Sequence, residues 1–194
     1  MASVSSPYGF RPQGNLISAA YNQKTRQFPI ASGYASNIFY GDPVNGLTTG
    51  FIAKEAGTTA VTAPGILGIF LGCSYTDPNT SQKIFKQFWP TGTVASDAVA
   101  YVFDDPEGVF QMQSGGPLVQ ADLFGNASLV QTAGSTTTGN SKISISTTVA
   151  ATATFPVKVI GFVNSPFSAV GDAFTDVFVK INFGAHAYQT ALAV

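Results

Sequence analysis

Hydrophobic and polar residues alternate along most of this chain, and a period of two predicts β-strands. In the stretch KISIS, Ile143 and Ile145 point to one side of a strand. In TDVFVKI the same holds for Val177, Val179 and Ile181. These residues are β-branched, as a half-buried pleated surface favours. The clusters of Gly, Pro, Asn and Asp between such runs are typical of turns.

The runs that we expect to form strands lie at 26–31, 37–40, 43–47, 50–56, 65–75, 82–89, 98–103, 108–113, 141–150, 155–163 and 174–183. No stretch of ten or more residues has the spacing of a helical stripe. Only 120–130 and the tail 186–194 have a pattern that allows a brief helical turn. We therefore predict an all-β protein whose body is a barrel or a sandwich.

The first 25 residues differ from this pattern. They carry isolated aromatic side chains among Ser, Pro, Gly and Asn, without a strand period. The alternatives are a floppy terminus and an extended N-terminal arm that becomes ordered on another surface. The spaced aromatics favour the arm, so we divide the chain into an arm, 1–25, and a single β-rich domain, 26–194. Within the domain, 132–141 is expected to be a polar surface loop or a hairpin connection.

The composition adds an argument about assembly. Of the 194 residues, 45% are hydrophobic and only 10% are charged, whereas roughly 25% charged is usual for a soluble domain. Surface charge normally prevents a soluble monomer from associating with its neighbours. We therefore expect much of this surface to be covered by partners.

Charge and targeting signals exclude several classes of function. The formal net charge of −1 and the thinly spread cations argue against a nucleic-acid partner. We find no secretory signal and no apolar run long enough to span a membrane. The single cysteine, Cys73, excludes an internal disulfide and lies in an apolar run, so we expect a small core residue.

The inventory of chemically active side chains argues against an enzyme. A zinc site or a catalytic triad would need His186, the single histidine, and no G-x-S-x-G motif precedes it. We expect His186 to have a structural or interface role. The chain also lacks the phosphate-binding and dinucleotide-binding glycine motifs. We therefore expect no catalytic residue, no metal and no cofactor.

Two acidic stretches can be interpreted either as chemically active sites or as turns. Asp104, Asp105 and Glu107 occur together in VFDDPEGVF, where a bound cation or a carboxylate pair is one alternative. The other is a turn, because Pro106 presets its φ and the glycine that follows permits a positive φ. We favour the turn, as a hairpin that joins 98–103 to 108–113. By the same reasoning Asp42, in FYGDPVNGL, is a turn residue.

A series of blocks along the chain resembles one group of viral proteins. The blocks are PYGFRP, IASGYASNIFYGDPV, GIFLGCSYTDP, FWPTGTVASDAVAYVFDDPEGVFQMQ, VIGFVNSP and GDAFTDVFVKIN. Taken in order, from about residue 7 to residue 183, they are similar to head decoration or capsid cement proteins of tailed bacteriophages, notably cyanophages and other aquatic phages.

The resemblance implies a structural protein without catalytic residues. Its partners would be the major capsid protein and itself, as a homotrimer on the outside of the icosahedral head. The protein would be made in the host cytoplasm and end on the capsid surface of the virion. An N-terminal arm of this kind reaches a neighbouring subunit, so Tyr8, Phe10 and Arg11 are the expected contact residues.

One alternative comes from a different class of function. A β-sandwich on a virion or cell surface can also bind a receptor or a carbohydrate, and aromatic side chains such as Trp89 and Tyr101 stack on sugars when they are exposed. Both side chains also suit a hydrophobic core. A glycosidase that acts through Asp104 or Asp105 is the third and weakest reading.

Overall fold

The computed structural model describes residues 3–15, 24–61 and 65–182, and it shows an all-β protein. Two antiparallel six-stranded sheets pack against each other, as in a sandwich, so the predicted fold class is confirmed. Within the described residues the helical structure consists of one short 3-10 turn, η1 (Gln120–Asp122).

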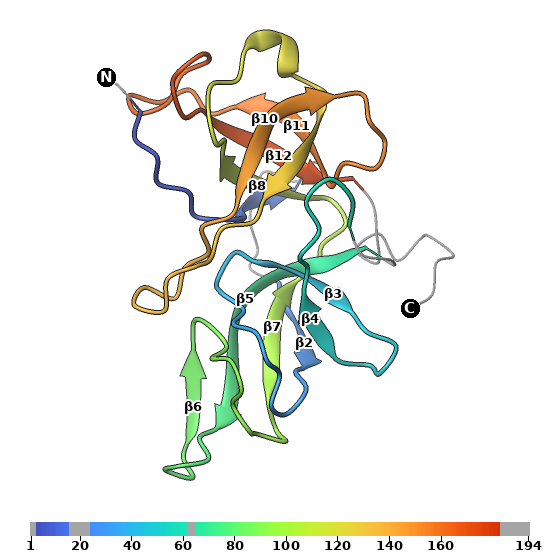
Figure 1. The fold of residues 1–194 in the computed structure, drawn as a ribbon, viewed down its shortest axis with the longest axis vertical. Helices are drawn as coiled ribbons and strands as arrows, with labels where there is room; N and C mark the ends of the chain where they lie inside the picture. Colours follow the sequence, from blue (N-terminus) through green and yellow to red (C-terminus); the bar gives the residue numbers. More distant parts are fainter. Residues whose placement is uncertain (1–2, 16–23, 62–64, 183–194) are drawn as a thin grey trace.

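The first sheet contains the start and the second half of the chain. Its strands, in spatial order, are β1 (Arg11–Asn15), β8 (Gly108–Gln113), β12 (Asp176–Ile181), β11 (Val157–Phe162), β9 (Asn126–Val130) and β10 (Ser144–Ala150). It forms the upper part of the molecule in Figure 1.

The second sheet is built from the segment between β1 and β8, and it forms the lower part of Figure 1. Its strands, in spatial order, are β2 (Arg26–Pro29), β7 (Val99–Phe103), β5 (Ile66–Thr76), β3 (Pro43–Gly46) and β4 (Ile52–Lys54). The strand β6 (Lys83–Lys86) pairs with the C-terminal part of β5, beyond the part that pairs with β3. The chain thus enters the first sheet, leaves it to build the second, and returns.

Each sheet covers a hydrophobic core. Ile143, Ile145 and the alternate residues of β12 are buried in the first core, as the period of two predicts. Ile66 and Phe103, from the second sheet, also lie in this first core, which shows where the two sheets meet. The second core surrounds Trp89 and contains Cys73, which confirms the expected core position of the thiol. Burial raises the pKa of this thiol to about 12.

The structure differs from the predicted elements in three places, although the brief helical turn allowed at 120–130 is present. Residues 37–40 form isolated bridges and no strand. The stretch 120–130 becomes helical only in η1 and then forms β9, because Ala127 and Leu129 are needed in the first core. The third difference is β1, which lies inside the predicted arm.

The turn at 104–108 is confirmed, but the predicted hairpin is wrong. The Asp105 carboxylate accepts a hydrogen bond from the backbone N–H of Glu107 (2.9 Å), and the Asp105 carbonyl accepts one from Gly108 (3.0 Å). However, β7 pairs with β2 and β5, whereas β8 pairs with β1 and β12. The turn therefore carries the chain from one sheet to the other.

The loop 132–141 is a hairpin connection, since it joins the antiparallel pair β9 and β10. The loop also contacts residues that precede β3 of the second sheet. Its Asn140 forms a bridge with Tyr40, and Gly134 lies against the ring of Phe39, where an added Cβ would approach the ring to 2.3 Å. Because a side chain at position 134 would collide with this ring, the contact requires glycine.

Candidate interaction surface

The N-terminal segment, residues 3–15, contains the predicted contact residues and lies along the chain's own first sheet. Its last five residues are β1, which pairs with β8 from Arg11 opposite Gln111 onward. Phe10 has no exposed surface and its ring packs edge-on against Phe110 and within the first core. In this structure Phe10 therefore has no surface with which to contact another subunit.

Tyr8 and Arg11 remain at the surface of this segment. The Arg11 guanidinium carbon lies 4.4 Å from the centre of the Tyr8 ring, which is a cation–π contact. The Tyr8 hydroxyl donates a hydrogen bond to the Asp176 carboxylate (3.1 Å). Arg11 is exposed and Tyr8 partly buried, so both are accessible to a partner. The remaining part of the predicted arm, 16–23, lies outside the described residues.

Gly9 explains why the segment follows this path. Its φ is +73°, and an added Cβ would lie 2.6 Å from the carbonyl oxygen of Gly41 and from the Ser141 side chain. Only glycine combines this conformation with so close an approach. The Gly9 N–H donates to the Ile143 carbonyl (3.1 Å), and Phe10 donates to Gly41 (2.9 Å).

The titration of Tyr8 and Asp176 reflects their partial burial. The pKa of Tyr8 is raised, first by burial and then by the nearby Asp176 carboxylate. The pKa of Asp176 is also raised by burial, although the hydrogen bond from Tyr8 and the charge of Arg11 oppose this shift. This is a structural cluster that fastens the segment to β12.

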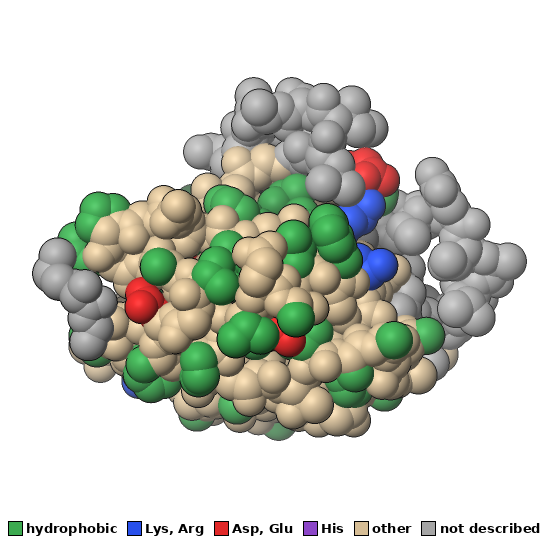
Figure 2. Space-filling model, turned by 90° about the horizontal axis from the view of Figure 1, so that it is seen from above, with side chains coloured by type: hydrophobic (Ala, Val, Ile, Leu, Met, Phe, Trp, Pro, Cys, Tyr) green, Lys and Arg blue, Asp and Glu red, His purple; other side chains and the backbone are tan. Residues whose placement is uncertain are grey.

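A second surface is apolar. Five large hydrophobic side chains are more than about two-fifths exposed at the end of the first sheet, and we call them the end face: Val4 (75%), Val119 (53%), Phe124 (70%), Phe167 (72%) and Val170 (43%). Figure 2, seen from above, shows hydrophobic side chains scattered over this end with few charged ones.

Hydrogen bonds hold the three segments of the end face together. The Gly171 N–H donates to the Leu118 carbonyl (2.8 Å), and the Phe174 N–H donates to the Ser3 hydroxyl (2.8 Å). The two acids among these loops, Asp122 and Asp172, accept hydrogen bonds from backbone N–H groups of their own loops. The sequence analysis missed this surface. The signal was a large aromatic residue inside a polar turn, as in DLFGN and SPFSAVGD.

The acidic stretch at 104–107 does not form one site. Asp104 is paired with Arg26 (3.2 Å), Asp105 is used in the turn, and Glu107 is paired with Lys180 (2.8 Å). In 3–15, 24–61 and 65–182, no group of three His, Cys, Asp or Glu side chains could hold a metal. His186 lies outside the described residues.

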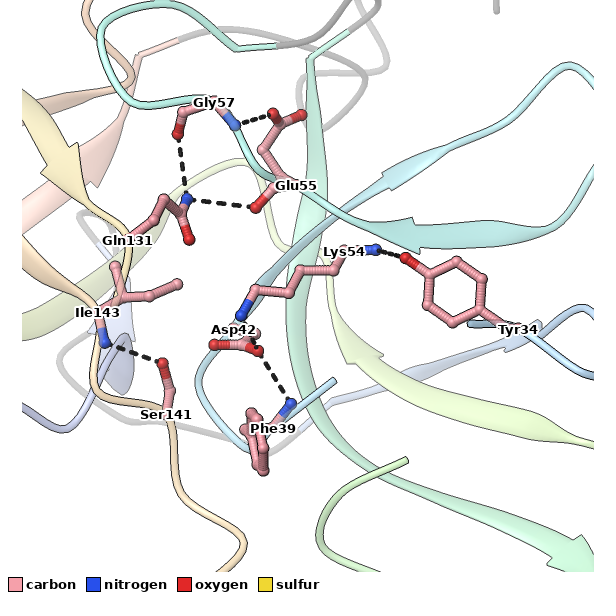
Figure 3. Close-up of polar contacts among 9 residues, drawn as sticks. All are labelled: Tyr34, Phe39, Asp42, Lys54, Glu55, Gly57, Gln131, Ser141 and Ile143. Atoms are coloured by element: carbon pink, nitrogen blue, oxygen red, sulfur yellow. Dashed lines mark hydrogen bonds and ion pairs between the residues drawn. The ribbon is translucent and has the colours of Figure 1, made fainter. Parts of the chain in front are cut away.

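Asp42 has a larger role than the predicted turn. It does close a turn, since its N–H donates to the Phe39 carbonyl (2.9 Å) and its carboxylate accepts from the Phe39 N–H (3.0 Å). It is also completely buried and forms an ion pair with Lys54 (2.9 Å), as Figure 3 shows. Its second oxygen, Oδ1, has no hydrogen-bond partner. Sequence spacing gives no signal that Lys54 is this partner.

The same region contains a polar connection between the sheets. The side-chain amide of Gln131, which follows β9, donates to the carbonyl groups of Glu55 (3.2 Å) and Gly57 (3.1 Å), which follow β4 (Figure 3). These contacts join the two sheets by backbone and amide groups and present no reactive group to solvent.

Comparisons with known proteins give no family. A scan against family models, a search of curated proteins and a search of solved structures found no match to this chain. In the part of the chain that the structure describes, no helix is both long and apolar enough to cross a membrane. The fold and surfaces therefore define the class as an all-β protein with an exposed apolar end.

Proposed function

We propose that this chain is a structural virion protein that decorates and cements the head of a tailed bacteriophage. In this proposal it binds as a homotrimer on the outside of the major capsid protein lattice. The observation that supports it best is the end face, where five large hydrophobic side chains are exposed on a protein with only 10% charged residues. Single exposed apolar side chains are common on protein surfaces, so the support comes from five large ones at one end of a protein with few charges.

The end face offers a physical basis for cementing. Burial of apolar surface contributes roughly 25 cal/mol per Å², so each copy would gain a modest affinity for its neighbours. Repetition over the many equivalent positions of a shell multiplies this gain. Neighbouring capsid subunits could then separate only by first removing the decoration.

The N-terminal segment has a second role in the proposal. Val4 belongs to the end face, and Tyr8 and Arg11 follow it in the segment that continues into β1, an edge strand of the first sheet. We infer that a partner subunit that covers the end face also contacts these two side chains. Phe10 is not part of this contact set, because its side chain is buried within its own chain.

The experiment compares matched Phe variants of exposed positions. Phe124→Ser with Phe167→Ser removes two rings of the end face, while Phe85→Ser removes an equally exposed ring from the second sheet (72%). Light scattering measures the oligomeric state, and co-sedimentation with empty heads of the phage that encodes this chain measures decoration. We expect the double variant to lose trimers and at least tenfold in shell occupancy, and Phe85→Ser to keep both. The proposal is contradicted if the wild-type protein remains monomeric and does not co-sediment with the shells.

A further inference from the structure

A hollow on the second sheet lies apart from the end face, on the sheet surface that carries Leu71 and that meets the first core further along β5. It has a volume of about 390 Å³ and is lined by residues of β5, β6 and β7 together with Gln87. The lining residues are Leu71, Gly72, Cys73, Phe85, Lys86, Gln87 and Tyr101. The hollow is shallow and open to solvent, so it can receive one face of a small ligand but cannot enclose it.

The hollow is bordered by two aromatic rings. Phe85 and Tyr101 are stacked, with ring centres 6.5 Å apart and planes inclined by 20°. Phe85 is 72% exposed, and on β5, β6 and β7 it is the one exposed large hydrophobic side chain. The Tyr101 hydroxyl and the Ser74 hydroxyl are 3.2 Å apart and share a hydrogen bond. An apolar ring face and hydroxyl groups therefore lie side by side.

The strand pattern explains why Phe85 points outward. Ile84 packs against the second core, so its neighbour Phe85 must lie on the opposite face of β6. Gly72 lets the backbone of β5 lie close to the backbone of β6 beside the hollow. It has a φ of +145°, and an added Cβ would lie 3.1 Å from the Lys86 carbonyl oxygen.

These features favour a particular class of ligand. A neutral pyranose ring has an apolar C–H face that fits an exposed aromatic ring, and a rim of hydroxyl groups that pair with amide and hydroxyl side chains. The lining supplies the ring of Phe85, the hydroxyl of Tyr101 and Gln87, whose amide nitrogen already donates to Asn140 (2.6 Å) and whose amide oxygen can accept a hydrogen bond. Lys86 is its one charged member, and its ammonium group lies over the rings of Tyr75 and Phe88, 5.9 Å from each ring centre.

A protein partner fits this surface less well. A stable protein interface covers roughly 800 Å² on each side and has an apolar centre. Phe85 is instead flanked on β6 by the exposed cations Lys83 and Lys86, and such lysines discourage pairing at a sheet edge. The surface is therefore suited to a small polar ligand with one apolar face.

We propose that this hollow binds a neutral sugar ring, which stacks on the exposed face of Phe85 that is turned away from Tyr101. This site would be independent of the trimer and capsid contacts proposed above. It would give the protein a weak glycan-binding activity on the side of the second sheet.

The test uses simple sugars and two matched phenylalanine variants. Saturation-transfer NMR is recorded with methyl glucoside, methyl mannoside and methyl galactoside at about 50 mM, because a single ring is expected to bind with a millimolar Kd. We compare the wild type with Phe85→Ala, Phe85→Trp and the control Phe124→Ala, whose ring is 70% exposed on the end face. We expect saturation transfer from the wild type, Phe85→Trp and Phe124→Ala, and at least a fivefold loss in Phe85→Ala.

The outcomes separate this proposal from the capsid proposal. Sugar binding in Phe85→Ala equal to that of the wild type overturns it, and so does the absence of transfer with all three sugars. A third outcome is that Phe85→Ala loses shell occupancy while the wild type binds none of the sugars. This would assign the Phe85 ring to a protein contact and would also overturn the sugar-site proposal. If only the end-face variants lose shell binding, that result does not bear on the sugar-site proposal.

Discussion

At the scale of single residues, the buried pair Asp42–Lys54 is the most consequential feature. The Asp42 carboxylate is completely buried and one of its oxygens has no partner, whereas the Lys54 side chain is 19% exposed. Loss of the lysine would leave a buried charge without compensation. Loss of the aspartate would leave a cation that can still reach water. The two partners therefore contribute unequally.

We predict that Lys54→Met lowers the free energy of unfolding by about 3–5 kcal/mol, because it leaves Asp42 buried and unpaired. Asp42→Asn is expected to cost less, and the double variant is expected to recover part of the loss in Lys54→Met. Urea unfolding of the three variants measures this. Equal losses in both single variants would contradict the proposed asymmetry.

A second residue-scale prediction concerns Tyr8 and Asp176. The pKa of Asp176 is raised in the folded protein, so its protonated form favours folding. That contribution is complete below the unfolded pKa of about 3.9 and is lost as the pH rises through the folded value. Tyr8→Phe removes a donor that stabilises the carboxylate, and we expect the pKa of Asp176 to rise further.

NMR titration of the Asp176 carboxyl carbon measures this shift. The stability difference between Tyr8→Phe and the wild type should be larger at neutral pH than at about pH 3, where the carboxyl is protonated in both. Arg11→Gln is the companion variant, because the charge of Arg11 also lowers this pKa. An Asp176 pKa that is unchanged in both variants would show that burial alone sets it.

At the scale of elements, β1 changes the meaning of the N-terminal arm. In the described residues 3–15, Phe10, Pro12 and Gly14 are buried while Arg11 and Gln13 are exposed, which is the period of a strand. The sequence hides this period, because proline and glycine occupy two of the buried positions. The segment is therefore part of the first sheet as well as a candidate contact.

We predict that Phe10→Ala lowers the free energy of unfolding by about 3–5 kcal/mol, the usual cost of removing a buried phenylalanine ring. Deletion of residues 1–15 should be at least as destabilising, since it also removes the pairing with β8. Thermal unfolding of the free protein measures both. Ser5→Ala is the control, because its side chain is exposed in the same segment and should change stability by less than about 0.5 kcal/mol.

Should the deletion leave the melting temperature of the free protein unchanged, β1 would contribute nothing to the fold. The segment would then act only as a contact for another subunit. Substitutions at Tyr8 and Arg11 are therefore a better test of partner binding than deletion, because they leave Phe10 in the core.

At the scale of the whole molecule, the surfaces differ in character. The end face is apolar and its two acids are bound within their own loops, while the exposed lysines of β6 lie at the second sheet. An interface made through the end face would depend on apolar burial more than on charge. Screening by salt should therefore have little effect on it.

We predict that shell occupancy changes by less than about threefold between 0.05 and 0.5 M NaCl, because the Debye length is short over most of that range and few charges meet. Co-sedimentation at a series of salt concentrations measures it. A steep fall with salt would assign the main contact to Arg11 and other cations rather than to the end face.

Local chemistry in the sequence was sufficient for several features. The period of two identified the strands whose alternate residues are buried, as in β12, and the run around Cys73 identified a core strand. The turn at Asp105 followed from Pro and Gly in the right order. These features depend on neighbours within a few residues, so the sequence alone determined the all-β class and most strand positions.

Only the tertiary structure decided which segments meet. It assigned β7 and β8 to different sheets, inserted Phe10 into the first core, buried Trp89, and paired Asp42 with Lys54. It also brought the five residues of the end face together from three distant segments. These contacts arise from packing between residues far apart in the chain, and the period of a strand carries no information about its partner.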